Sequence, residues 1–147
     1  MNGSTVKESF SFGEVVTLSG VKPRTLDHWA ATSFLSPSIK RAGGTGTKRV
    51  YSFADVVAAR TARELRTAGA SLQGLRKVVK ELRKGEFGAH LADARLIVSG
   101  KDVHVLDNQD LISLLSKPGQ THFAFTVLNL GATVMALRSE VERMKVA

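Results

Sequence analysis

The first apolar positions of the chain are spaced as in a short helix. Ser11 followed by Glu14 fits a capping box, in which each residue caps the other at a helix start. Gly20 is placed to end this helix. The pattern therefore predicts a helix of about two turns, whose apolar residues are Val15, Val16 and Leu18.

A second helix is predicted at residues 24 to about 32. Pro23 stands at its first turn, where the missing N–H of proline costs nothing. Two short helices joined by a glycine-containing turn predict a helix-turn-helix. The inward face of the second helix would hold Leu26, Trp29 and Ala30.

A flexible, basic stretch follows at residues 40–49, and Val50 and Tyr51 after it favour a return strand. A loop between short strands beside a helix-turn-helix is a wing. The glycines of this loop do not match a phosphate-binding P-loop, because Thr47 rather than Gly precedes Lys48. We therefore predict a basic wing at 40–50 rather than a nucleotide site.

Two further helices complete the first half. Ser52 with Asp55 begins one that runs to about Ala68, and Gly69 suits its C-terminal cap. Ser71 caps the next helix. Its apolar residues recur at helical spacing and are Leu72, Leu75, Val78, Val79 and Leu82.

The second half mixes strands and helices. Residues 96–98 and 103–106 predict a β-hairpin, residues 107–115 a short helix and residues 122–130 a strand. A final helix starts at Gly131. Its apolar positions are spaced 3, 4 and 3, as in a seam of two heptads that would contribute to a dimer, and they are Val134, Leu137, Val141 and Met144.

Charge is concentrated in the first half of the 147 residues. Residues 1–84 hold 15 of the 21 Lys and Arg residues but only 6 of the 13 Asp and Glu residues. Such a one-sided positive field indicates a polyanionic partner, most commonly DNA. The charge balance changes near Lys84, and residues 85–88 are typical of a linker. We therefore predict three parts: a domain at 10–84, the linker at 85–88 and a small module at 89–147.

Composition excludes several kinds of functional site. The chain has no cysteine, which excludes disulfides and thiolate sites. The four histidines show no metal-ligand spacing, and we find no catalytic constellation. No apolar run approaches the roughly 20 residues of a membrane span. We expect no catalytic residues, no metal, no cofactor and no membrane, and a cytoplasmic protein associated with the bacterial nucleoid.

Residues 10–83 resemble the DNA-binding domain of the MerR family of transcription regulators. The resemblance rests on motifs in the expected order, GEVV at 13–16, LSGV at 18–21, PRTLDHW at 23–29, LSP at 35–37, KRVYSFADV at 48–56 and LRTAGASL at 65–72. It implies a mainly α fold with small β elements: a winged helix-turn-helix, here followed by a small α+β module and a C-terminal helix. It also implies a homodimer that binds an inverted repeat in double-stranded DNA and works with RNA polymerase.

The resemblance assigns the helix at 23–31 to the major groove and the loop to the backbone or minor groove. Arg24 is the candidate for a bidentate contact to guanine or for a phosphate clamp, and Trp29 is expected in the core. Tyr51 has two readings, core packing or a hydroxyl contact to phosphate. The predicted DNA-binding residues are Lys22, Arg24, Thr25, His28, Lys40, Arg41, Lys48, Arg49 and Tyr51.

Asp27 departs from the family pattern, which has a basic residue at this position and often tyrosine at the position of His28. A carboxylate facing phosphates is repulsive. Three roles are open: accepting a hydrogen bond from cytosine N4, pairing with Arg24, or pairing with an arginine of the wing.

Two other functions compete with sequence-specific regulation. One is an architectural or excision-type accessory protein that binds DNA without regulating transcription. In the other, the module at 89–147 binds a ligand or a protein and DNA serves only as an address. An enzyme is not expected.

Overall fold

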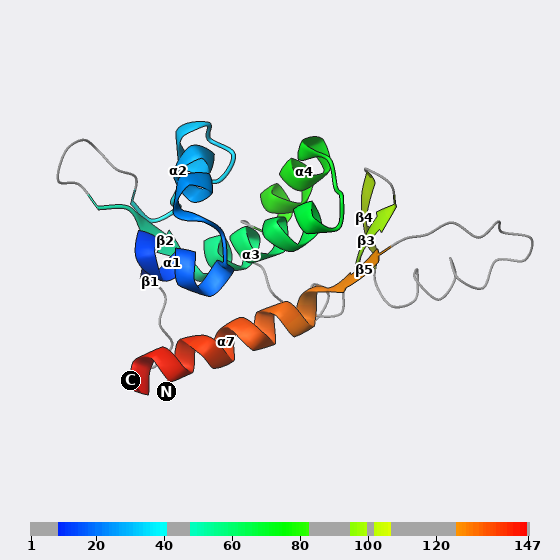
Figure 1. Ribbon diagram of the computed structural model, residues 1–147. Helices are drawn as coiled ribbons and strands as arrows, with labels where there is room; N and C mark the ends of the chain where they lie inside the picture. The colour runs from blue at the N-terminus through cyan, green and yellow to red at the C-terminus, as the bar shows by residue number, and fades with distance from the viewer. Residues whose placement is uncertain (1–8, 41–47, 83–94, 100–101, 107–125, 147) are drawn as a thin grey trace, which may run out of the picture.

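The computed structural model describes residues 9–40, 48–82, 95–99, 102–106 and 126–146 (Figure 1). Arg41, the predicted linker at 85–88 and the predicted helix at 107–115 lie outside these ranges. The elements are β1 (Ser9–Ser11), α1 (Phe12–Ser19), α2 (Pro23–Ala31), β2 (Val50–Ser52), α3 (Phe53–Thr67), α4 (Leu72–Leu82), β3 (Arg95–Ser99), β4 (Asp102–Leu106), β5 (Thr126–Asn129) and α7 (Leu130–Val146).

The predicted capping box at Ser11 and the predicted helix start at Ser52 are confirmed. At the start of α1, the Glu14 amide donates to Ser11 Oγ at 3.2 Å and the Ser11 amide donates to Glu14 Oε1 at 2.9 Å. Ser52 and Asp55 make the same pair of bonds at the start of α3. These local bonds satisfy amides that a helix start leaves without partners, so both helices begin where the sequence indicates.

The wing strand pairs with a strand that the sequence analysis missed. β2 runs antiparallel to β1, with Phe10 opposite Tyr51. On the other side of the loop, Lys40 makes only an isolated bridge to Val50. Three residues are too few to show the alternation that identifies a strand, so β1 had no sequence signal.

One apolar cluster joins both halves of the chain. Leu26 of α2, Val57 of α3 and Leu75 of α4 are buried in it, together with Leu96 of β3 and Leu137 of α7. The predicted hairpin is confirmed as β3 and β4, and β5 adds to β3 to give the antiparallel order β4-β3-β5. The mainly helical fold with small β elements and a C-terminal helix is therefore confirmed.

Helix α7 packs along α1 and α3 (Figure 1). Leu137 and Val141 are buried there, and Val134 and Met144 are half-buried against the same cluster. The predicted seam thus contacts the first half of its own chain, and its role in a dimer stays a prediction. Within the described ranges, no helix is long and apolar enough to cross a membrane.

Candidate nucleic-acid interface

A rigid turn sets the angle between α1 and α2. Gly20 has a φ of 77°, a left-handed conformation that glycine adopts at little cost. Ser19 Oγ donates to the Val15 carbonyl at 2.6 Å and accepts from the Val21 amide at 3.1 Å. Since Ser19 and Val21 are buried, this turn holds α2 in one orientation relative to the core.

Helix α2 buries one face and exposes the other. Leu26 is fully buried, and the ring centroids of Trp29 and Phe34 lie 5.1 Å apart. Trp29 is partly buried and packs against the core, as expected. Arg24 and His28 are exposed, and Thr25 is half-buried. Lys22 precedes the helix and is exposed. Its side chain does not cap the helix, because a lysine ammonium cannot accept a hydrogen bond from a backbone amide.

The base of the wing is fixed to α3 through Asp55. This buried carboxylate accepts hydrogen bonds from the Ser38 amide at 2.8 Å and from Ser38 Oγ at 2.6 Å, in addition to its bond from Ser52. Lys40 and Lys48, at the two ends of the wing loop, are exposed. Both cations therefore extend from an anchored stem.

Asp27 pairs with the wing, which decides among the three roles left open above for the free protein. Arg49 Nη2 lies 2.6 Å from Asp27 Oδ1, and the Arg49 guanidinium sits over the Phe12 ring at 5.3 Å from its centroid. The hydrogen bond to Asp27 raises the pKa of Arg49, and partial burial opposes this rise. Arg49 thus links the wing to α2 while remaining charged.

Tyr51 corrects one predicted contact. Its side chain is fully buried, so in this conformation the hydroxyl does not reach a phosphate, and the core reading of Tyr51 holds. Burial raises the pKa of the Tyr51 hydroxyl, which the positive charge of Arg49 partly offsets. The sequence left this open because an alternating strand position does not show which face is covered.

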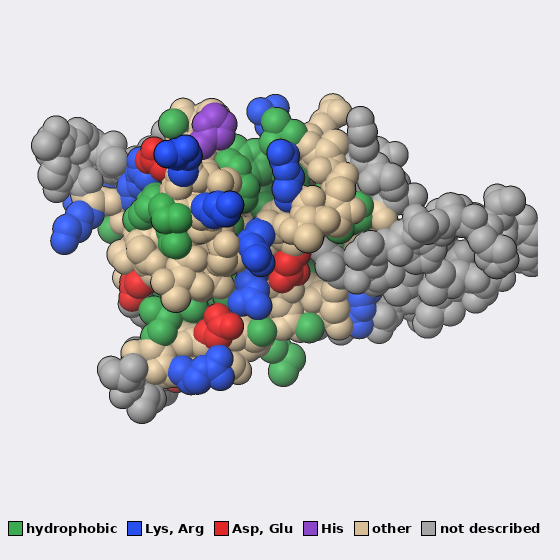
Figure 2. All heavy atoms as spheres, viewed as in Figure 1, with side chains coloured by type: hydrophobic (Ala, Val, Ile, Leu, Met, Phe, Trp, Pro, Cys, Tyr) green, Lys and Arg blue, Asp and Glu red, His purple; other side chains and the backbone are tan. Residues whose placement is uncertain are grey.

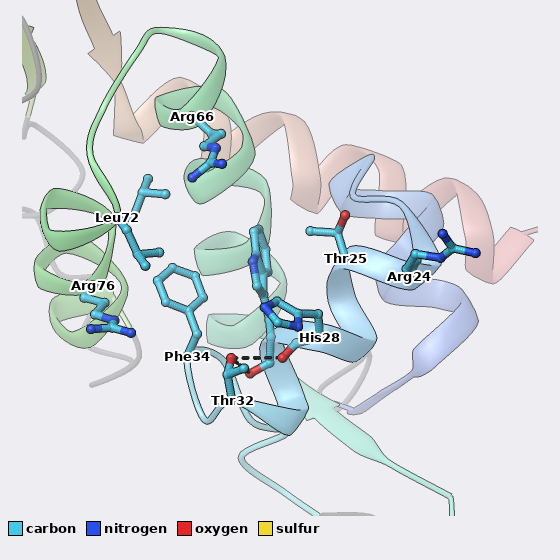
Figure 3. A pocket seen from close by; sticks show the side chains of 10 residues that line it. Arg24, Thr25, His28, Thr32, Phe34, Arg66, Leu72 and Arg76 are labelled. Carbon is cyan, nitrogen blue, oxygen red and sulfur yellow. Dashed lines mark hydrogen bonds between the residues drawn. The ribbon is translucent and has the colours of Figure 1, made fainter.

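A cleft of about 640 Å³ separates α2 from α4. Figure 3 shows His28 and Phe34 facing it from one side and Arg66, Leu72 and Arg76 on the other, with the Arg24 guanidinium turned away from α4. A neighbouring hollow of about 390 Å³ shares Phe34 and Arg76 and extends the groove.

Cationic side chains surround this cleft. Figure 2 shows Lys and Arg side chains on both sides of the gap between α2 and α4 and continuing over α3. Arg66 and Arg76 were not predicted as site residues, although Arg66 lies within the LRTAGASL segment at 65–72. Helical spacing alone does not reveal which exposed residues of α3 and α4 face α2.

A match to a protein-family model identifies the family of the first half of the chain. Residues 10–82 match the family model described as MerR HTH family regulatory protein. Residues 10–82 belong to the MerR family of helix-turn-helix regulatory proteins. In this MerR domain, α1 and α2 form the helix-turn-helix, and β1 and β2 form an antiparallel pair of strands.

Two kinds of known protein are similar to the chain that carries this MerR domain. Proteins of Mycobacterium bovis and Mycobacterium tuberculosis named as uncharacterized HTH-type transcriptional regulators are 34% identical over 110 residues, which is 75% of this chain. The chain spans about half the length of these relatives, 48%. A crystal structure of a MerR-family transcriptional regulator from Bacillus cereus is 14% identical, with 92% of this chain and 98% of that one covered and a TM-score of 0.41.

The predicted site residues fall into three places. Arg24, Thr25 and His28 line the cleft, whereas Lys40, Lys48 and Arg49 flank the predicted wing loop and Tyr51 is in the core. Among the described residues, no group of three or more His, Asp and Glu side chains is arranged to hold a metal ion.

Proposed function

We propose that this chain is a sequence-specific transcription regulator that binds double-stranded DNA with α2 in the major groove. The observation that carries the proposal is the cleft between α2 and α4, which Arg24, His28, Arg66 and Arg76 line from three different helices. A concave surface that carries Arg66 and Arg76 on one wall, with Arg24 beside it on the exposed face of α2, suits the line of phosphates on a duplex.

The two walls of the cleft are suited to different contacts. Arg24 stands at the start of α2 with its side chain exposed and turned away from α4, so it is free to reach a base edge (Figure 3). Arg66 and Arg76 face α2 from the opposite wall, where the backbone of a strand beside the groove would pass. We assign Arg24 to guanine and the other two to phosphates.

The wing adds a second contact. Lys40, Lys48 and Arg49 lie at the base of the predicted wing, where Arg49 contacts Asp27 of α2, and basic side chains of this kind suit the backbone or the minor groove. With Thr25 and Lys22 at the start of α2, the interface covers both sides of the recognition helix.

We further propose a homodimer on an inverted repeat. Helix α2 has only nine residues and reads a few base pairs, so two copies are needed to specify a long site. RNA polymerase is the expected protein partner and the nucleoid in the cytoplasm the expected location, in keeping with the regulator names of the mycobacterial relatives. These assignments make the chain a regulator rather than an enzyme.

Single substitutions separate the two kinds of DNA contact. A duplex is first selected from a random pool with the wild-type protein. We expect Arg24→Ala to weaken binding to that duplex by about tenfold, corresponding to the loss of one bidentate base contact, with less effect on the random pool. Arg76→Ala should weaken binding to both, and reduce the slope of log affinity against log salt by about 0.9.

Arg143→Ala is the matched control, because Arg143 is exposed on α7 and does not line the cleft. It should change neither affinity by more than about twofold. Fluorescence anisotropy at several salt concentrations measures all three variants. Equal losses for Arg24→Ala and Arg143→Ala, or a wild-type affinity that does not depend on salt, would refute the interface.

A further inference from the structure

Asp27 places a negative charge on the exposed face of α2, where Arg24 supplies the positive charge. Its side chain is 62% exposed, and Arg24 precedes it by three residues, a spacing that places both on one side of the helix. His28 follows it on the same exposed side. Under the proposed function, on which this inference rests, the carboxylate therefore lies at the surface that meets DNA.

The ion pair with Arg49 does not account for Asp27 on grounds of stability. An ion pair with one partner this exposed contributes little to the free energy of folding. Arg49 is only 23% exposed and also packs over Phe12, so Asp27 is the outer member of the pair. The arrangement puts a carboxylate in front of the arginine on the side open to solvent.

The chemistry of a carboxylate restricts what it can face in a groove. An ionised Asp27 only accepts hydrogen bonds. Phosphate oxygens, guanine N7 and O6, and thymine O4 are also acceptors and are therefore unfavourable neighbours. The amino groups of cytosine N4 and adenine N6 are donors that a carboxylate can bind in the major groove.

We propose that Asp27 is a specificity-determining residue, which together with Arg24 reads two neighbouring base pairs. Arg24 donates to guanine, and Asp27 accepts from the amino group of cytosine or adenine. Three residues rise about 4.5 Å along the helix axis, against about 3.4 Å between stacked bases, so side chains of this length can reach neighbouring base pairs. The pair would therefore recognise a guanine next to a base pair that presents the amino group of cytosine or adenine.

This role works mainly through repulsion. On an unmatched duplex, the carboxylate faces acceptors and phosphates and partly neutralises Arg49. On a matched duplex, the amino group compensates the carboxylate. Asp27 therefore lowers affinity for random DNA more than affinity for the matched site, which is how an unfavourable contact produces specificity.

Asp27→Ala tests the proposal with two duplex probes, the random pool and the duplex selected from it by the wild-type protein. We expect the affinity for the random pool to rise about fivefold, because one repulsive charge is removed. The affinity for the selected duplex should change by no more than about twofold, since the lost amino contact offsets that gain. Glu142→Ala, which removes an exposed carboxylate from α7, is the matched control and should leave both affinities unchanged.

Repeated site selection gives the second readout. With Asp27→Ala, the preference for cytosine or adenine at one position should disappear while the neighbouring guanine preference remains. With Arg49→Ala, both preferences should remain, because Asp27 reads the base directly. An unchanged profile for Asp27→Ala, equal gains on both duplexes, or loss of the same preference in Arg49→Ala would overturn the proposal.

These outcomes are separate from failure of the proposed function. If the wild-type protein selects no sequence at all, the DNA site itself is wrong, and Asp27 has no base to read. If it selects a site that depends on Arg24 but not on Asp27, the proposed function stands and this inference alone is wrong.

Discussion

At the scale of single residues, the interface depends on how its cations are held. Arg49 is bound by Asp27 and stacked on Phe12, so the base of the wing stays next to α2. Arg24 instead has an exposed side chain on the outer face of α2. Both arginines were predicted to contact DNA, but Arg49 is held by its partners whereas the side chain of Arg24 is exposed. We therefore assign base reading to Arg24.

Tyr51→Phe should be tolerated at neutral pH and alter the alkaline limit of stability. The buried hydroxyl has no hydrogen-bond partner among the described residues, so its removal should change the free energy of unfolding by less than about 1 kcal/mol. Burial raises the pKa of Tyr51 in the folded state. Its contribution is therefore complete below its ordinary pKa of about 10 and is lost as the pH rises through the folded value.

Urea unfolding at pH 7 and at pH values around 10 to 11 measures this effect. The wild-type protein should lose more stability over the alkaline range than Tyr51→Phe. A loss of more than about 2 kcal/mol in Tyr51→Phe at pH 7 would show that the hydroxyl has a partner.

At the scale of elements, α7 is the segment whose environment differs most from the simplest expectation. A seam with 3, 4, 3 spacing is typical of two helices that pair, yet Leu137 and Val141 pack on α1 and α3 of the same chain. Arg60 supports this contact, because it lies 3.4 Å from Glu140 on α7 and donates to the Leu18 carbonyl at the end of α1. The helix that follows the sheet is thus attached directly to the scaffold of the helix-turn-helix.

Leu137→Ala should lower the free energy of unfolding by about 2 to 5 kcal/mol, because Leu137 is fully buried where α7 packs on the first half of the chain. Met135→Ala is the control, since Met135 is 73% exposed on the same helix and should cost no more than about 0.5 kcal/mol. Chemical unfolding of both variants measures the difference. Similar losses would mean that α7 does not pack as described.

At the scale of the whole molecule, the positive charge and the exposed helix occur in the same half. The net charge is +8, and the cleft between α2 and α4 is lined by three arginines. Because phosphate contacts act at long range and without sequence preference, this field would bring the protein to DNA before α2 reads bases.

The proposed dimer makes a separate prediction at this scale. On a duplex that carries the selected inverted repeat, multi-angle light scattering should find two chains for each duplex. A duplex with one half-site replaced should bind much more weakly, because the second α2 loses its base contacts. One chain for each duplex, with equal affinity for both duplexes, would contradict the dimer.

Local sequence signals were sufficient for most of the helices and for the family. Capping boxes at Ser11 and Ser52, the left-handed Gly20 and Pro23 act within a few residues, so their effects are readable without a tertiary fold. The ordered motifs from residue 10 onwards likewise identify the MerR family without the tertiary structure.

Contacts between residues far apart in the chain were not readable in this way. Four features of this kind join segments that are distant in the sequence. They are the pairing of β1 with β2, the bond from Arg49 to Asp27, the burial of Tyr51 and the approach of Arg66 and Arg76 to α2. The packing of α7 on α1 and α3 belongs to the same group, because an apolar seam specifies that a surface is covered but not which surface covers it. Short-range bonding thus determined the elements, and packing across the chain determined which side chains share the interface.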